Sequence, residues 1–186
     1  LKSLTGGHSN VAIGYSAMDN AQHSEQHNIA IGKDSMGSVS EGGSGQADFN
    51  VAIGTNAIAG GTLSGSDKLF GNIAIGYNAL DATGTNPSTG QVAIGHQALS
   101  ACTSGTVNLA IGYQSLSSLT TGVGNVAVGS NTLEDITTGG YNTIVGHEAM
   151  QNAQTGVSLS TAVGFRAGYK LGDDGASDHS DANIMI

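Results

Sequence analysis

Residues 108–139 read NLAIGYQSLSSLTTGVGNVAVGSNTLEDITTG, a unit of about 17 residues followed by a second copy of itself. The copies open as Asn108-Leu-Ala-Ile-Gly112 and Asn125-Val-Ala-Val-Gly129. Three residues after each glycine comes a small or β-branched residue, and the fourth residue is apolar. Thr-Thr-Gly then closes the unit. A repeat of this length predicts stacked coils, because a single short unit cannot bury its own apolar face.

The same unit recurs along most of the chain, and its opening strand always ends on glycine. Successive repeat glycines differ in residue number by 18, 22, 22, 19, 17, 17, 17 and 18. The copies are therefore regular in the second half of the chain and carry insertions in the first half. The structural repeat residues are Gly14, Gly32, Gly54, Gly76, Gly95, Gly112, Gly129, Gly146 and Gly164.

Within the opening strand, side chains alternate between two faces. In the first copy Val11 and Ile13 share one face and Ala12 lies on the other. We expect the Val/Ile face to form the core of the coil, and the Ala row to form a contact between subunits. Gly14 suits a corner with positive φ or a close backbone approach, and the leading Asn10 suits a hydrogen-bonded ladder between coils.

These patterns predict an all-β protein, a parallel β-solenoid or β-roll of about nine coils of about 17 residues. Coils spaced about 4.8 Å apart would make a rod of roughly 40 Å. A rod this thin favours assembly with copies of itself, and we expect a trimer or another symmetric bundle. A disordered low-complexity segment is the alternative for a chain with 30 glycines, but the strict recurrence of apolar pairs disfavours it.

Composition excludes several classes of function. The formal net charge is −9 and there are only 5 Lys and Arg residues, so a nucleic-acid partner is not expected. No apolar run approaches the roughly 20 residues of a membrane-spanning helix, so no membrane insertion is expected. Cys102 is the single cysteine, so stability must come from repetition and packing rather than an intrachain disulfide.

The copies NVAIGYSAM from Asn10 and NIAIGYNAL from Asn72, with Thr-Thr-Gly closures, resemble the repeats of bacteriophage tail fibre proteins. They are also similar, more loosely, to the head repeats of trimeric autotransporter adhesins. The resemblance runs from Asn10 to Gly164 and implies a homotrimeric fibre, located in the tail fibre of a virion, that contributes to adhesion to a host cell surface. Its partners would be itself, adjoining tail or fibre proteins and host surface polysaccharide. It brings no catalytic residues and no cofactor.

Three regions follow from the spacing: coils with long inserted loops over 1–90, regular coils over 91–168, and an acidic turn with the start of a further repeat over 169–186. The insertions run over 37–49, 59–71 and 81–90, and insertions in solenoids often carry binding. Because both ends fall inside the repeat register, we expect the chain to be a slice of a longer array.

Candidates for chemistry are few. Four acidic residues near the C-terminus could hold Ca²⁺, although a solvated loop is favoured: Asp173, Asp174, Asp178 and Asp181. The segment 42–48 approaches a calcium-binding nonapeptide, but its aspartate is one position late. His23 and His27 do not match a metalloprotease pattern, and we interpret them as turn residues. Directly after the repeat glycines, four rings form either a sparse sugar-stacking row or, as we favour, rim cover between coils: Tyr15, Tyr77, Tyr113 and Phe165. His96 and His147 occupy the same position of the repeat, which we interpret as variable and surface-facing.

These observations predict a non-enzymatic structural and adhesive fibre segment. The head of an autotransporter adhesin on a bacterial outer surface is the alternative. A tailspike-type polysaccharide depolymerase ranks lower, because it needs two carboxylates facing each other across a groove and aromatic rings to hold sugars. An ice-binding array ranks last, because Thr is concentrated in turns.

Overall fold

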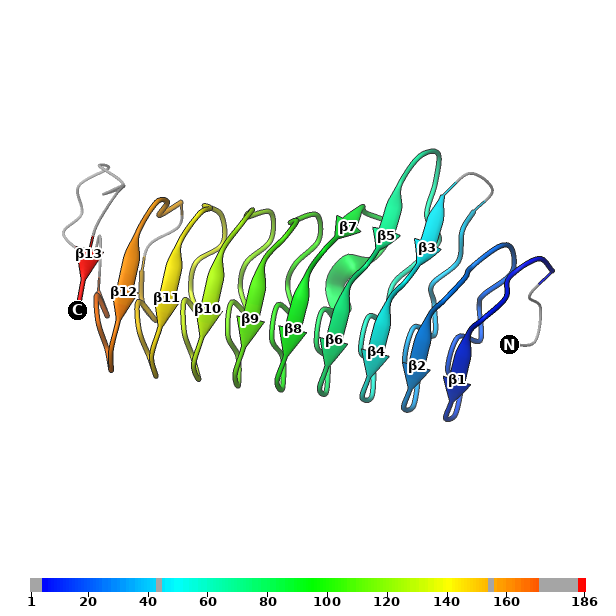
Figure 1. Cartoon of the computed structure of the whole chain (residues 1–186), viewed down its shortest axis with the longest axis horizontal. Helices are drawn as coiled ribbons and strands as arrows, with labels where there is room; N and C mark the ends of the chain where they lie inside the picture. The colour runs from blue at the N-terminus through cyan, green and yellow to red at the C-terminus, as the bar shows by residue number, and fades with distance from the viewer. Residues whose placement is uncertain (1–4, 43–44, 154–155, 171–183) are drawn as a thin grey trace.

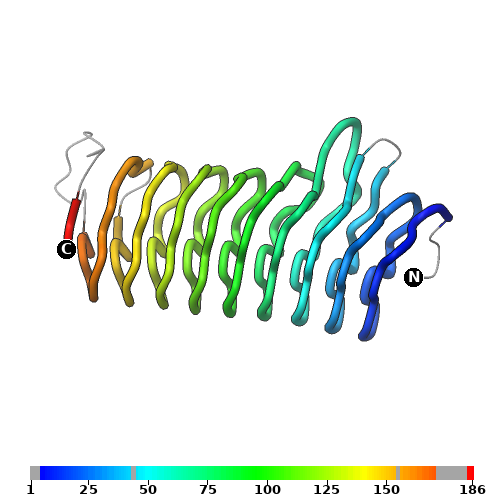
Figure 2. The backbone as a smooth tube through the Cα atoms, in the orientation of Figure 1, coloured from blue at the N-terminus to red at the C-terminus, as the bar shows by residue number. Residues whose placement is uncertain are grey.

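Short parallel strands stack into one long sheet that runs the length of the molecule (Figure 1). The computed structural model describes residues 5–42, 45–153, 156–170 and 184–186. Among these residues ten strands form the sheet in chain order: β1 (Val11–Ile13), β2 (Ile29–Ile31), β4 (Val51–Ile53), β6 (Ile73–Ile75), β8 (Val92–Ile94), β9 (Leu109–Ile111), β10 (Val126–Val128), β11 (Thr143–Val145), β12 (Thr161–Val163) and β13 (Ile184–Met185). The predicted all-β parallel solenoid is confirmed, and the backbone trace in Figure 2 shows its successive coils.

The register places equivalent residues of the repeat beside one another. Ala30 of β2 pairs with Ala52 of β4, and Ala93 of β8 pairs with Ala110 of β9. The strands themselves span three residues, because the flanking Asn and Gly turn the chain. Backbone hydrogen bonds nevertheless continue through these flanks, as from Gly95 N to Ile75 O at 2.8 Å. Nine steps of about 4.8 Å give the sheet a length of about 43 Å.

The long connections of the first half build a second, smaller sheet. It contains β3 (Gln46–Asp48), β5 (Lys68–Phe70) and β7 (Ser88–Thr89), all parallel. These strands lie beyond one end of β4, β6 and β8, where the long arms project from the rod (Figure 1). The third connection also contains the short 3-10 helix η1 (Asp81–Thr83). The insertions therefore extend the coils rather than forming separate loops.

The orientation predicted for the strand side chains is wrong. The central Ala of each strand faces the interior of its own coil, and Ala52, Ala74 and Ala93 are completely buried. The flanking aliphatic residues face outward: Val11 is 42% exposed and Ile13 is 58% exposed. Opposite sides of one coil lie close together, so the strand facing the larger side chains must present small ones. A contact between subunits made by the Ala row is thereby excluded.

The larger side chains come from the turn segment that follows each repeat glycine. Leu99 and Leu116, four residues after their glycines, are fully buried, and so is Leu119 three residues later. One coil reverses part of this distribution, because Ile144 occupies the inward strand position and is fully buried. That coil carries Ala153 where the preceding one carries Ile136, so a gain in volume on one side accompanies a loss on the other.

The predicted ladder of leading asparagines is confirmed. Asn108 donates from Nδ2 to Gln91 Oε1 at 3.0 Å and to Gly122 O at 2.8 Å. Its own Oδ1 accepts from the backbone N and the Nδ2 of Asn125. Because these amides are buried, leaving any of them without a partner would be costly. The same pattern links Asn10, Asn28, Asn50, Asn72, Gln91, Asn108, Asn125 and Asn142, and Ser160 ends it.

The repeat glycine is required for both of the reasons that the sequence suggested. Gly95 has φ +138°, and a Cβ there would lie 2.2 Å from the carbonyl oxygen of Gly112 in the next coil. No other residue fits that approach without moving the backbone. The turn after it uses further left-handed residues, with φ 56° at Gln97 and 53° at Leu99. Leu99 N donates to Ser115 O at 3.1 Å, so the turn also bonds to the next coil.

Candidate binding surfaces

The outward side chains of the strands form one continuous apolar surface, which we call the aliphatic face. It contains two residues from each of nine strands, none of them charged: Val11, Ile13, Ile29, Ile31, Val51, Ile53, Ile73, Ile75, Val92, Ile94, Leu109, Ile111, Val126, Val128, Thr143, Val145, Thr161 and Val163. Sixteen of these eighteen residues are aliphatic and β-branched or Leu, and the two threonines lie in β11 and β12. Exposed apolar surfaces of this continuity mark interaction sites.

The residues directly after the repeat glycines form a column along one margin of this sheet, and six of the nine carry an exposed ring. Tyr77 stacks on His96 with ring centroids 5.2 Å apart, and His96 stacks on Tyr113 at 5.1 Å. His147 and Phe165 form a second, tilted pair at 5.7 Å. Tyr15 lies in the same column in the first coil and is 76% exposed. The sequence identified the members of this column but not their stacking, which depends on the spacing of the coils.

The second residue after each repeat glycine belongs to a second column. In the middle of the rod this column consists of amide side chains. Asn56 donates from Nδ2 to Asn78 Oδ1 at 3.1 Å, and Gln114 donates from Nε2 to Gln97 Oε1 at 3.3 Å. All four side chains are partly exposed. The left-handed backbone at these positions, with φ 51° at Asn78, is one that Asn tolerates better than most residues. Sequence reasoning missed this column, although its regular spacing was available as a signal.

Another row of rings lies at the opposite margin, before the leading asparagines of the first coils. His27 stacks on Phe49 with centroids 4.7 Å apart and planes 2° from parallel. His8 meets His27 edge-on at 5.3 Å, and Phe49 meets Phe70 at 5.2 Å. The prediction that His27 is a turn residue omitted this contact, which depends on coils 18 to 22 residues apart in sequence.

Buried carboxylates in and beside the first long connection cap backbone amides. Glu25 is fully buried and accepts from Glu41 N at 3.0 Å and His23 N at 3.0 Å. Glu41 accepts from Ala47 N at 3.0 Å and Ser24 N at 3.2 Å. Burial raises the pKa of the Glu41 carboxyl, and the neighbouring Asp48 and Glu25 raise it further. These groups satisfy the backbone of the wider coils, so their arrangement is structural.

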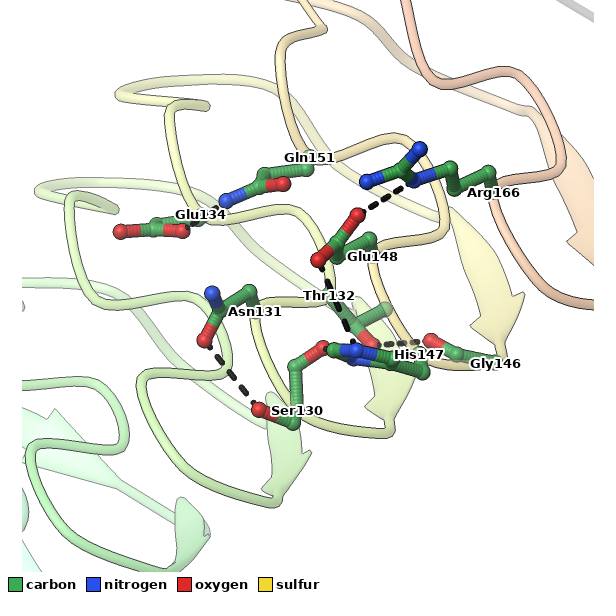
Figure 3. Close-up of polar contacts among 9 residues, drawn as sticks. All are labelled: Ser130, Asn131, Thr132, Glu134, Gly146, His147, Glu148, Gln151 and Arg166. Carbon is green, nitrogen blue, oxygen red and sulfur yellow. Dashed lines mark hydrogen bonds and ion pairs between the residues drawn. The ribbon is translucent and has the colours of Figure 1, made fainter.

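The C-terminal coils carry charged contacts in the same two columns (Figure 3). Glu148 accepts a hydrogen bond from Arg166 Nε and lies 3.5 Å from His147 Nε2. Arg166 also lies over the rings of Phe165 and Tyr169, 5.1 and 5.0 Å from their centroids. Glu134 accepts from Gln151 one coil away, so polar side chains link successive coils on this side of the rod (Figure 3).

The weak metal candidates receive no support from the described residues. Asp173, Asp174, Asp178 and Asp181 lie outside the described residues. In the segment 42–48, the Oδ1 of Asp48 accepts from Gln26 N at 2.8 Å, which is a structural bond. No group of three or more His, Cys, Asp or Glu side chains in the described ranges is arranged to hold a metal ion.

Comparisons with known proteins give no relative: no family model, no curated protein and no solved structure matches the chain. Across the part of the chain that the structure describes, no helix is long and apolar enough to cross a membrane.

Proposed function

We propose that this chain is a structural and adhesive segment of a bacteriophage tail fibre, assembled as a homotrimer that supports or contributes to binding of a host cell surface. The aliphatic face carries the proposal. It extends along the whole rod without a charge, although the chain contains 19 charged residues, 5 basic and 14 acidic.

A second copy of the chain is the occupant that suits this face. The face repeats every coil, at about 4.8 Å, and only a partner with the same repeat can match it over nine coils. The three-fold stoichiometry and the virion location rest on the resemblance of the repeats to tail fibre proteins. The head of an autotransporter adhesin on a bacterial outer surface shares that resemblance and is the second candidate.

Neighbouring residues of β8 provide a matched pair of variants for the test of assembly. Ile94→Lys places a charge on the aliphatic face, and we expect sedimentation equilibrium to show a folded monomer where the unaltered protein is a trimer. Ala93→Leu adds volume inside the coil, where overpacking costs about 1–3 kcal/mol or more, and we expect a loss of folding itself. A stable monomer of the unaltered protein in native buffer would refute the proposed assembly.

A depolymerase cleaves polysaccharide into oligosaccharides, whereas a non-enzymatic fibre leaves it intact. Incubation of the purified protein with purified host surface polysaccharide should release no oligosaccharide, as measured by size-exclusion chromatography. Release of oligosaccharide would overturn the proposal of a non-enzymatic fibre.

A further inference from the structure

Five consecutive coils share an uncharged set of side chains after their repeat glycines. We call this set the amide–ring strip, and it consists of Thr55, Asn56, Tyr77, Asn78, His96, Gln97, Tyr113, Gln114, Ser130 and Asn131. Every coil of the strip contributes one amide, so an amide recurs about every 4.8 Å along the rod. The three middle coils add a ring, and the two outer coils add a hydroxyl.

Charged side chains border the strip at both ends. Lys33 and Asp34 occupy the two columns in the preceding coil and lie 3.3 Å apart. His147 and Glu148 occupy them in the following coil, where Glu148 also binds Arg166. The neutral character of the five middle coils is therefore a local property. The same two columns carry charged side chains in the neighbouring coils.

The rings of the strip are accessible and held in place. Tyr77 is 48% exposed and Tyr113 is 49% exposed, while both stack on His96. The next coils on either side carry Thr55 and Ser130 at this position, so no further ring stacks on the two tyrosines. The strip thus offers two fixed aromatic surfaces that lose little conformational entropy when a ligand binds.

The amides supply the complementary polar groups. Asn and Gln side chains each carry both donors and an acceptor, which matches the hydroxyl groups of sugars. The pairs Asn56–Asn78 and Gln97–Gln114 are already bonded to one another, which orients their remaining groups. The strip contains no Lys or Arg side chain to hold a phosphate or sulfate, and no Asp or Glu side chain to hold an amine.

We propose that the amide–ring strip binds an extended neutral polysaccharide that lies along the rod. The spacing of the coils is close to the length of one pyranose unit, so successive sugars meet successive coils. Sugars pack against the outer faces of Tyr77 and Tyr113, and their hydroxyls bond to the amides and to the tyrosine hydroxyls. This inference rests on the proposed adhesive function and assigns its recognition to the regular coils as well as the long arms.

Binding is tested with the full chain on an array of purified neutral and acidic bacterial surface polysaccharides. We expect binding to at least one neutral polysaccharide. The chain has 5 Tyr and no Trp, so tyrosine emission can then be titrated directly with that polysaccharide. Tyr113→Ala should weaken binding at least tenfold, and Gln114→Glu should do the same by placing a charge in the strip while keeping the side-chain shape.

Tyr141→Ala is the matched control, because Tyr141 is a 65% exposed ring at the opposite margin of the sheet. It should bind as the unaltered protein does. The inference is overturned by no binding to any neutral polysaccharide, by binding only to acidic ones, or by equal losses in Tyr141→Ala and Tyr113→Ala. Sedimentation of each sample separates the two proposals. A trimer without affinity refutes only the glycan strip, whereas a monomer refutes the fibre assembly.

Discussion

At the scale of single residues, each coil depends on positions where only one side-chain size is possible. Gly95 has no room for a Cβ because the backbone of the next coil passes beside it. Ala93 lies directly opposite the side of the coil that supplies Leu99 and Cys102, and all three are fully buried. The repeat glycine therefore recurs because the next coil leaves no room for a Cβ. The central alanine recurs where the opposite side of the coil supplies the larger side chains, and Ile144 replaces it in the coil that carries Ala153.

Replacement of the repeat glycine tests this close approach. In Gly95→Ala the new Cβ would lie 2.2 Å from Gly112 O at φ +138°, and we expect a loss of about 4 kcal/mol or more in unfolding free energy. Gly65→Ala is the control, because Gly65 has φ +58° with nothing within 4 Å of the new Cβ. Its cost should be about 1–2 kcal/mol. Equal costs in urea denaturation would contradict the role assigned to the contact between coils.

At the scale of the structural element, the buried amide ladder and the long arms are the two features that organise the coils. The ladder connects the leading side chain of each coil to the next and also to a carbonyl on the far side, as from Asn142 Nδ2 to Val157 O at 2.8 Å. Each rung thus ties the sheet to the opposite side of its coil. The arms add a second, three-stranded sheet, and isolated parallel bridges continue its pairing from Thr89 through Thr106 and Val123 to Gly140.

Substitution of one ladder residue should remove hydrogen bonds to the coils on both sides of it. Asn108→Ala removes two donated bonds and leaves the backbone N of Asn125 without its acceptor, while Asn125 Nδ2 keeps its bond to Gly139 O alone. We expect a loss of about 3–5 kcal/mol in unfolding free energy. Asn108→Gln should recover at least half of it, since Gln91 occupies a rung of the same ladder. A loss below about 1 kcal/mol for the alanine variant in urea denaturation would contradict this account.

The arms should respond to pH in an unusual direction. Burial, together with Asp48 and Glu25, raises the pKa of Glu41 above its ordinary value of 4.5. The folded state therefore binds this proton more readily than the unfolded state. The contribution of Glu41 to stability is then smallest above the raised pKa and grows as the pH falls towards 4.5.

Hydrogen exchange measures this effect at the Ala47 amide, which donates to Glu41. After correction for intrinsic exchange, we expect the free energy of local opening to rise as the pH is lowered from about 7 to about 5. Glu41→Gln, which cannot titrate, should abolish that dependence. A free energy that falls over the same range in the unaltered chain would show that the pKa of Glu41 is not raised.

At the scale of the whole molecule, we expect stability to depend on the proposed assembly. A rod about 43 Å long with an uncharged aliphatic face along one side exposes apolar surface that association would bury. We therefore expect the melting temperature to rise by about 2–4 °C for each tenfold increase in protein concentration. Ile111→Lys should remove this dependence without loss of the β circular dichroism signal. A concentration-independent melting temperature in the unaltered protein would contradict assembly through this face.

Much of this architecture follows from the sequence alone. The spacing of glycines and aliphatic pairs determines the parallel solenoid, the number of coils and the position of the long connections. Even the asparagine ladder is evident, because a polar residue at one position of every copy must find its partners in the neighbouring copies. The rings at Tyr77, His96 and Tyr113 were likewise located, as members of a single column.

The tertiary structure alone decided which side of the strand faces inward. Alternation separates Val92 and Ile94 from Ala93, but it is symmetric and does not say which set is buried. The answer depends on the volume supplied by the opposite side of the coil, where the residue four after each glycine fills the interior. Long-range geometry likewise decides the stacking of the rings, the amide column and the pairing of the second sheet in the arms. Residues 17 to 22 apart in sequence come together there only because the coils stack in register.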